Sequence, residues 1–161
     1  DVTASWNDQV GPGRMNARLA YTYVREGWNQ PLPDSERDPF VDEIGAAKNK
    51  ATLNLGYRWN GFNIQSTVSY IGKSYLDDQF LSQFDLPARS VGIGSRTYTD
   101  LQVTYALHRT TELYFGLDNV FDTKAPPIIS GLPGNDTGTE TDAGTYDAIG
   151  RRFYVGLRVR L

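Results

Sequence analysis

The sequence predicts an all-β protein built from antiparallel strands. Its last ten residues alternate strictly, with an apolar residue at every second position from Phe153 to Leu161 and with Arg152, Arg158 and Arg160 among the positions between them. A strand sends successive side chains to opposite faces, so this pattern gives one apolar face and one polar face. Ten tyrosines, seven phenylalanines and sixteen glycines also favour strands and turns.

The same alternation predicts about seven strands along the chain. Apolar residues occupy the odd positions of the second, third, fifth and sixth predicted strands, and the even positions of the fourth. An Asn60-Gly61 pair between the third and fourth strands is typical of a two-residue hairpin turn. The predicted strands are residues 1–6, 14–24, 50–59, 62–75, 97–107, 111–122 and 150–161.

Short and long connections alternate between these strands. Residues 7–13, 60–61 and 108–111 are short turns, whereas the other three connections are long and rich in Gly, Pro, Asp and Ser: 25–49, 76–96 and 123–149. Consecutive antiparallel strands end at opposite edges of a sheet. All the short turns are therefore expected at one edge, and all the long loops at the other.

Composition excludes several classes of protein. The net charge is -3, which leaves no basic excess for a nucleic-acid partner. The chain has no cysteine, and so it has no disulfide scaffold and no thiolate chemistry. No apolar run reaches the 18 or so residues of a membrane-spanning helix.

Strands of about ten residues with short turns on one side and long loops on the other are typical of bacterial outer-membrane β-barrels. Such barrels carry aromatic girdles at both membrane interfaces. We expect Trp6, Trp59 and Phe62 beside the short turns and Tyr21, Tyr23, Tyr70 and Tyr98 toward the long loops. The alternative is a soluble sandwich in which these aromatic residues fill the core.

A single-chain bacterial barrel has an even number of strands, and seven strands do not meet that rule. We therefore expect residues 1–161 to be the C-terminal portion of a larger antiparallel transmembrane β-barrel. At about 23 residues per strand and connection, a 22-stranded barrel of the plugged kind needs roughly 500 residues. The remaining strands and the plug are expected in another segment or chain.

Two motifs near the C-terminus carry a family resemblance. LDNVFDTKAPP at 117–127 and YDAIGRRFYVGLRVRL at 146–161 resemble the last two strands of TonB-dependent outer-membrane receptors, and AYTYV at 20–24 resembles earlier strands of such barrels. These barrels usually end on Phe or Trp, whereas this chain ends on Leu161. The resemblance implies uptake of a scarce nutrient, most often a ferric siderophore, driven by the TonB complex through the plug. It implies no resident cofactor, and iron would enter only within the transported ligand.

Ligand contacts are expected in the long loops, where arginine suits anionic chelates and aromatic side chains suit catechol or sugar rings. The candidates are Trp28, Arg37 and Phe40 in the first loop and Phe80, Phe84 and Arg89 in the second. The alternative for each is that it packs one loop against another or binds lipopolysaccharide. Oligosaccharides and cobalamin are alternative ligands for the same architecture.

Two other site types receive less support from the sequence. The third loop carries Asp136, Glu140, Asp142 and Asp147 but lacks the ligand spacing of a calcium-binding EF-hand, and we expect a solvated acidic loop. A small outer-membrane barrel enzyme would need a Ser-His pair, and the single histidine, His108, lies in a short turn without a G-x-S-x-G motif. We therefore expect no enzyme and no metal site; a lipocalin-like carrier remains a third alternative.

Overall fold

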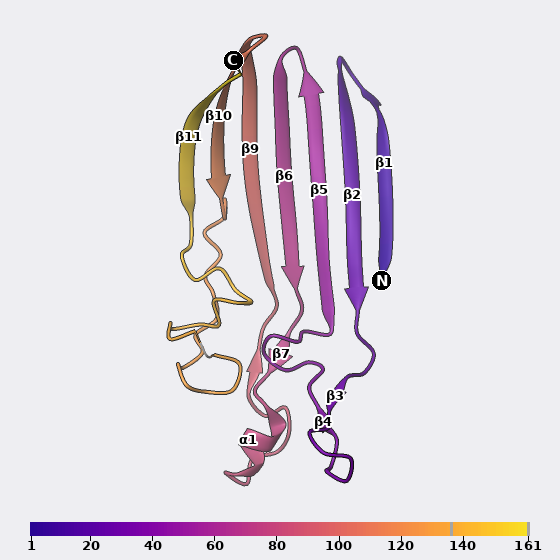
Figure 1. Cartoon of the computed structure of the whole chain (residues 1–161), viewed down its shortest axis with the longest axis vertical. Helices are drawn as coiled ribbons and strands as arrows, with labels where there is room; N and C mark the ends of the chain where they lie inside the picture. Colours follow the sequence, from indigo (N-terminus) through magenta and orange to yellow (C-terminus); the bar gives the residue numbers. More distant parts are fainter. Residues whose placement is uncertain (136, 161) are drawn as a thin grey trace.

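The computed structural model describes residues 1–135 and 137–160, and it contains one large antiparallel sheet. Leu161 and Asp136, which figure in the predictions above, lie outside the described residues. The strands of the sheet follow chain order, each paired with its predecessor, as Figure 1 shows. Their bounds are β1 Val2–Val10, β2 Gly13–Tyr23, β5 Asn49–Trp59, β6 Phe62–Ile71, β9 Arg96–His108, β10 Thr111–Asp118 and β11 Arg152–Val159. The prediction of an all-β protein with seven antiparallel strands is confirmed.

The sheet is open. Within the described residues, β1 and β11 are its edges and each has a paired neighbour on one side only. The short turns lie together at one end of the strands and the long loops at the other, and the two termini lie at opposite ends (Figure 1). This polarity agrees with the alternation of short and long connections in the sequence.

Two hairpins have the turn residues that their backbone geometry demands. Asn60 and Gly61 both have positive φ, 43° and 82°, as a type I′ turn requires. Gly11 has φ 58° and is followed by Pro12, which suits the first two central positions of a type II′ turn. Val10 pairs with Gly13, so the loop that connects the two strands of this hairpin is two residues long.

Several strand ends differ from the predictions. The first strand continues to Val10 instead of ending at Trp6, because Asn7, Asp8 and Gln9 pair with β2 although all three are polar. The fourth strand ends at Ile71, and Ser74–Tyr75 forms a separate short strand. The sixth ends at Asp118, where Asn119 turns the backbone to a positive φ.

The long loops contain short elements that the sequence did not predict. The first loop holds the pair β3 Trp28–Asn29 and β4 Asp38–Pro39. The second holds the pair β7 Ser74–Tyr75 and β8 Gly92–Ile93, with helix α1 Asp78–Ser82 between them. Among the described residues, no helix is both long and apolar enough to cross a membrane.

The register gives the whole sheet two different faces. Across β2 to β11, one row of partners reads Met15, Tyr57, Ile64, Val103, Phe115 and Val155. The adjacent row, which points to the other face, reads Arg14, Arg58, Asn63, Thr104, Tyr114 and Gly156. We call these the apolar face and the polar face. The alternation seen in single segments therefore stays in phase over the six strands from β2 to β11, and on β1 the partner of Met15 in the apolar row is Asp8.

The apolar face is uncovered, and the buried core lies elsewhere. Phe153 and Val155 are 80% and 70% exposed. The buried hydrophobic side chains belong instead to the long loops and to the adjoining end of β9: Ala47, Leu76, Leu81, Tyr98, Ile128 and Tyr146. The loops pack against one another, whereas no part of the described chain packs on the apolar face of the sheet.

Two of the expected girdle residues are placed differently by the structure. Tyr98 pairs with Ser69, is buried, and has the parity of Arg96 and Asp100, so it lies on the polar face; its assignment to an outward girdle is wrong. Trp6 is on the apolar face but pairs with Ala17 in mid-strand, because β1 extends to Val10.

The other five expected girdle residues lie on the apolar face near strand ends. At the short-turn end, the Trp59 and Phe62 rings are 6.4 Å apart, and Tyr105, which sequence reasoning missed, lies 4.5 Å from Phe62. Tyr21, Tyr23 and Tyr70 lie toward the long loops.

Candidate functional site at the long-loop edge

The long-loop edge, made of residues 24–48, 72–95 and 119–151, is the candidate functional site. It is the part of the molecule in which loops that are far apart in sequence gather at one end of the sheet (Figure 1). Acidic residues outnumber basic residues there, fourteen against seven. The strand residues on the polar face have the opposite balance, with seven basic residues against three acidic ones, while a fourth acidic strand residue, Asp8, lies on the apolar face. The long loops and the polar face of the sheet therefore differ in charge.

The first loop is a small hairpin that carries three of the predicted ligand contacts. The guanidinium of Arg37 lies 4.1 Å from the Trp28 ring centroid, and Trp28 pairs with Pro39 across the hairpin. The Phe40 ring packs so closely on Gly27 that a Cβ there would overlap it. Trp28 and Arg37 thus form a partly exposed cation–π pair, whereas Phe40 serves the hairpin itself.

The second loop is organised around α1. The side chain of Asp77 caps the helix by accepting a hydrogen bond from the backbone N–H of Phe80 at 2.6 Å. Leu81 is 1% exposed and anchors the helix on the loops. The Phe80 and Phe84 rings lie 5.1 Å apart, and Phe84 is exposed. These two predicted contacts therefore form a second aromatic pair.

The first two loops are joined directly. The backbone N–H of Ile44 donates to the carbonyl of Tyr75 at 3.1 Å, and the N–H of Tyr75 donates to the carbonyl of Asp42 at 2.7 Å. Arg89 forms an ion pair with Asp42 at 3.5 Å and lies over the Tyr75 ring. For Arg89, these contacts favour the alternative in which the residue packs loops together.

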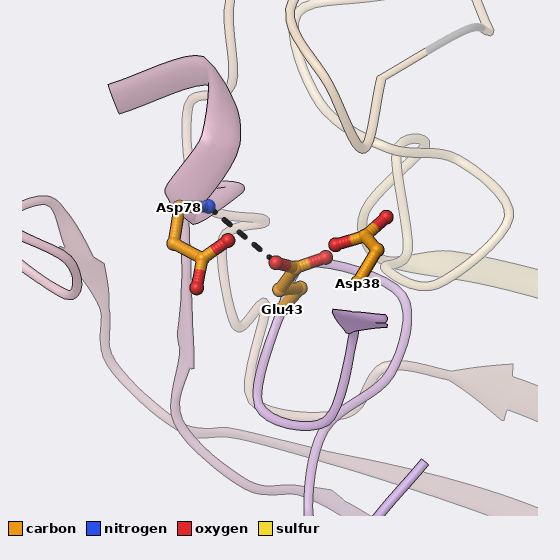
Figure 2. A group of neighbouring side chains, drawn as sticks. All are labelled: Asp38, Glu43 and Asp78. Carbon is orange, nitrogen blue, oxygen red and sulfur yellow. Dashed lines mark hydrogen bonds between the residues drawn. The ribbon is translucent and has the colours of Figure 1, made fainter. Parts of the chain in front are cut away.

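Three carboxylates from these loops form a cluster that the sequence did not predict. Asp38, Glu43 and Asp78 each place a carboxylate oxygen within 4.8 Å of the others, and Figure 2 shows them turned toward one another. Glu43 also accepts a hydrogen bond from the backbone N–H of Asp78 at 3.4 Å. No spacing in the sequence could have revealed this cluster, because it exists only when the two loops pack together.

Charge repulsion and burial shape the chemistry of this cluster. Burial first, and then the negative charge of Asp77, raise the pKa of Glu43 to about 7 from its ordinary 4.5. The pKa of Asp38 is also raised, by burial and by the charges of Asp77 and Asp78. Oxygen ligands of this kind suit Ca²⁺ or Mg²⁺, but Ca²⁺ takes roughly six to eight oxygens and the cluster supplies one from each residue. Protonation of Glu43 as the pH falls through about 7 removes part of this repulsion.

The third loop is built on two buried asparagines. Asn135 donates from Nδ2 to the carbonyls of Ile128 and Thr139, at 2.7 and 2.8 Å. Asn119 donates to the Thr123 carbonyl and to Asp147, and its Oδ1 accepts from the N–H of Thr123. Asp147 also forms an ion pair with Arg152 at 3.6 Å. Among the described acidic residues of this loop, Asp147 is therefore structural rather than simply solvated.

The predicted ligand contacts do not converge on one pocket. The structure brings them together as pairs within their own loops, Trp28 with Arg37 and Phe80 with Phe84. The hollow between the first two loops, lined by Glu43, Tyr75 and Asp78 among others, measures about 60 Å³. Small-molecule sites usually measure roughly 300 to 1,000 Å³. A ligand of that size would have to lie over the loops rather than inside this hollow.

The single histidine lies far from these loops along the strand. His108 is the last residue of β9 and pairs with Thr111, so it lies in a strand next to the short turn at 109–110 rather than within the turn as predicted.

Comparisons with known proteins add no further assignment. No protein-family model, curated protein or solved structure matches the chain.

Proposed function

We propose that this chain is the C-terminal portion of a transmembrane β-barrel of a TonB-dependent receptor, which takes up a scarce nutrient across the bacterial outer membrane. The observation that carries the proposal is the separation of an apolar face and a polar face over the seven strands, in which Asp8 is the one charged strand residue on the apolar face. In a sheet of this kind, the apolar face suits contact with lipid, and the polar face suits a water-filled or plugged lumen.

The size of the uncovered apolar face supports a lipid environment. Soluble monomers rarely expose continuous apolar patches beyond a few hundred Å². Here every strand of the sheet contributes side chains to a continuous apolar patch; Leu53, Val103, Phe115 and Val155 are examples. A sandwich core would need a second sheet or helices over this face, and the described residues provide neither.

The open edges support the expectation that this chain is one portion of a barrel. In hydrocarbon, unpaired backbone groups cannot be satisfied by water, and only closed barrels avoid such edges. The outer edges of β1 and β11 therefore need partner strands, supplied by another segment or chain. The plug, through which the TonB complex acts, belongs to the same missing partners.

The long-loop edge is then the extracellular, ligand-capturing side. The pairs Trp28–Arg37 and Phe80–Phe84 offer exposed aromatic surface that suits catechol or sugar rings. A ferric siderophore is the first ligand class to test. Because the loops are net acidic, we expect contacts through aromatic stacking rather than through a general positive field.

Three measurements test this function: fractionation, uptake and ligand affinity. The complete native protein should fractionate with the outer membrane and run as a heat-modifiable species in detergent. Cells that lack the protein should lose uptake of one radiolabelled ferric chelate under iron limitation. The double substitution Trp28→Ala/Phe84→Ala should lower the affinity of the protein for that chelate. Recovery of the protein as a soluble species without detergent would reject the proposal, whereas a membrane barrel without iron uptake would reject only the ligand class.

A further inference from the structure

Two adjoining hollows lie in the third loop, and together we call them the third-loop groove. They measure about 380 Å³ and about 460 Å³, and Pro127, Thr139 and Glu140 line both of them. Residues 127–130 and 138–141 form the two main walls. Small-molecule sites usually measure roughly 300 to 1,000 Å³, so each hollow is large enough for a ligand, unlike the hollow of about 60 Å³ between the first two loops.

Hydrogen bonds hold the two walls of the groove together. The backbone N–H of Ile128 donates to the carbonyl of Glu140 at 2.8 Å. The side chain of Asn135, which is fully buried, donates to the carbonyls of Ile128 and Thr139, one from each wall. The walls are thus fixed relative to each other, as a preformed binding site requires.

The larger hollow is the apolar half of the groove. Pro127 and Ile129 line it, and Ile129 is 75% exposed. Ile149, which is equally exposed, lines the smaller hollow. Single exposed apolar residues are common on protein surfaces. Two of them in adjoining hollows of this size offer apolar surface that a bound ligand would remove from water.

The smaller hollow is the polar half of the groove. Thr141 lines it and is only 5% exposed, yet its hydroxyl has no hydrogen-bond partner within the part of the chain that the structure describes. Buried hydroxyls are nearly always hydrogen-bonded in folded proteins. The polar half therefore contains a group that a ligand could satisfy.

Glu140 determines which charge the groove favours. Among the described residues, no basic nitrogen lies within 4.0 Å of its carboxylate. The other charged residues of the lining already have partners, Lys124 with Asp122 at 2.8 Å and Asp147 with Arg152 at 3.6 Å. The long loops also carry fourteen acidic residues against seven basic ones. Both observations favour a positively charged ligand.

We propose that the third-loop groove binds a small organic cation, with an ammonium group at Glu140 and an apolar chain along Pro127 and Ile129. Ammonium N–H groups donate both to carboxylates and to hydroxyls, and so one group can serve Glu140 and Thr141. An anion would be repelled by Glu140, and an uncharged chain would leave the carboxylate unpaired. This proposal goes beyond the proposed function, since it concerns the third loop and does not require the sheet to lie in lipid.

The test uses the complete protein in nanodiscs of zwitterionic phosphatidylcholine, with n-hexylammonium chloride as the probe. Three matched compounds each change one feature of the probe: hexanoate reverses its charge, 1-hexanol removes the charge, and methylammonium removes the apolar chain. Dissociation constants are measured by titration with saturation-transfer-difference NMR. Empty nanodiscs give the background for partition into lipid.

We expect hexylammonium to bind about tenfold or more tightly than each matched compound, because it alone combines the charge and the chain. Glu140→Gln should weaken its binding about tenfold and leave hexanol binding unchanged. Thr141→Val, which keeps the volume of the side chain, should weaken hexylammonium binding several-fold. The matched control is Glu36→Gln, at an exposed carboxylate of the first loop, which should change neither affinity.

Three results would overturn the proposal: no binding of hexylammonium above empty nanodiscs, equal affinity for hexylammonium and hexanoate, or an affinity for hexylammonium that Glu140→Gln does not change. If Thr141→Val alters amide exchange in the third loop, Ile129→Ser replaces it and should weaken the binding of hexylammonium and hexanol alike. Fractionation with the outer membrane and uptake of the ferric chelate are measured separately. A failed result in the groove therefore leaves the receptor function standing, and a failed receptor function leaves the groove to be judged by its own titrations.

Discussion

The short-turn half and the long-loop half of the molecule are stabilised in different ways. The sheet has a regular register and tight turns, yet the side chains of its apolar face stay exposed. The loops are irregular, yet they hold nearly all the buried side chains, among them Leu81, Asn119 and Asn135. The loops therefore carry their own core, whereas the described residues place no such core over the apolar face of the sheet. Substitutions in the two halves should differ in what they disrupt.

The largest effect is expected on the apolar face. Val103→Arg places a charge at the centre of that face, between Ile64 and Phe115, and should cost about 2 to 4 kcal/mol if lipid covers it. Thr104→Arg, one residue later on the polar face, is the matched control. The measurement is the heat-modifiable fraction in outer membranes and urea unfolding in lipid vesicles. Equal tolerance of both variants would argue against a lipid-facing sheet.

A substitution in the loop core should act locally. Leu81→Ala removes the side chain that anchors α1, at a cost of about 2 kcal/mol, near the low end for buried leucines because an exposed loop can relax. Hydrogen exchange should then speed up in residues 72–95 and stay unchanged in β6. A matched control is Leu86→Ala, because Leu86 follows the same helix but is exposed. If exchange in β6 also accelerates, the loop and the sheet are one cooperative unit and the contrast between them fails.

The third loop should become more mobile when Asn119 is replaced. Asn119→Ala deletes hydrogen bonds to Thr123 and Asp147 and leaves buried polar groups without partners, at about 1 to 3 kcal/mol. The residue also has a φ of 50°, which asparagine tolerates better than alanine does. Limited proteolysis between residues 119 and 151 should become several-fold faster. Asn54→Ala, at an exposed site on the polar face, should leave this cleavage unchanged.

The same contrast explains what the sequence could predict. Strand positions and the two faces follow from a period of two and from local turn signals such as Asn60-Gly61, so the sheet was predictable within a few residues. The first strand was expected to end early because Asn7 to Gln9 are all polar and carry no alternation, although their backbone pairs with β2. Tyr98 was misplaced because aromatic character was given more weight than its even position.

The loop structure was largely unpredictable, since it depends on contacts between segments with no shared period. The pairing of Glu43 with Asp78 requires two loops to meet, as does the ion pair of Asp42 with Arg89. By contrast, the local pair Phe80 and Phe84 has the spacing of one helical turn, a signal that could have indicated α1. Structure with a local sequence period could therefore be predicted from the sequence, whereas the packing of one loop against another could not.

The smallest expected effect concerns pH at the junction of the first two loops. The folded state raises the pKa of Glu43 from 4.5 to about 7, and it therefore binds a proton more tightly than the unfolded chain does. The docking of the loops should be strongest below pH 4.5 and should weaken as the pH rises through 7. Because the group is partly exposed, the change should stay below about tenfold in the rate of amide exchange at Tyr75 and Ile44.

Glu43→Gln isolates this effect, since it keeps the shape of the side chain and removes its titration. The variant should exchange these amides more slowly than the wild type near pH 8 and at the same rate near pH 4, after correction for intrinsic exchange. Glu36→Gln, an acidic residue of the same loop that is not in the cluster, should show no such dependence. If wild type and Glu43→Gln respond to pH in the same way, the proton is not shared within this cluster, and loop docking depends on the backbone pairs and the Arg89–Asp42 contact alone.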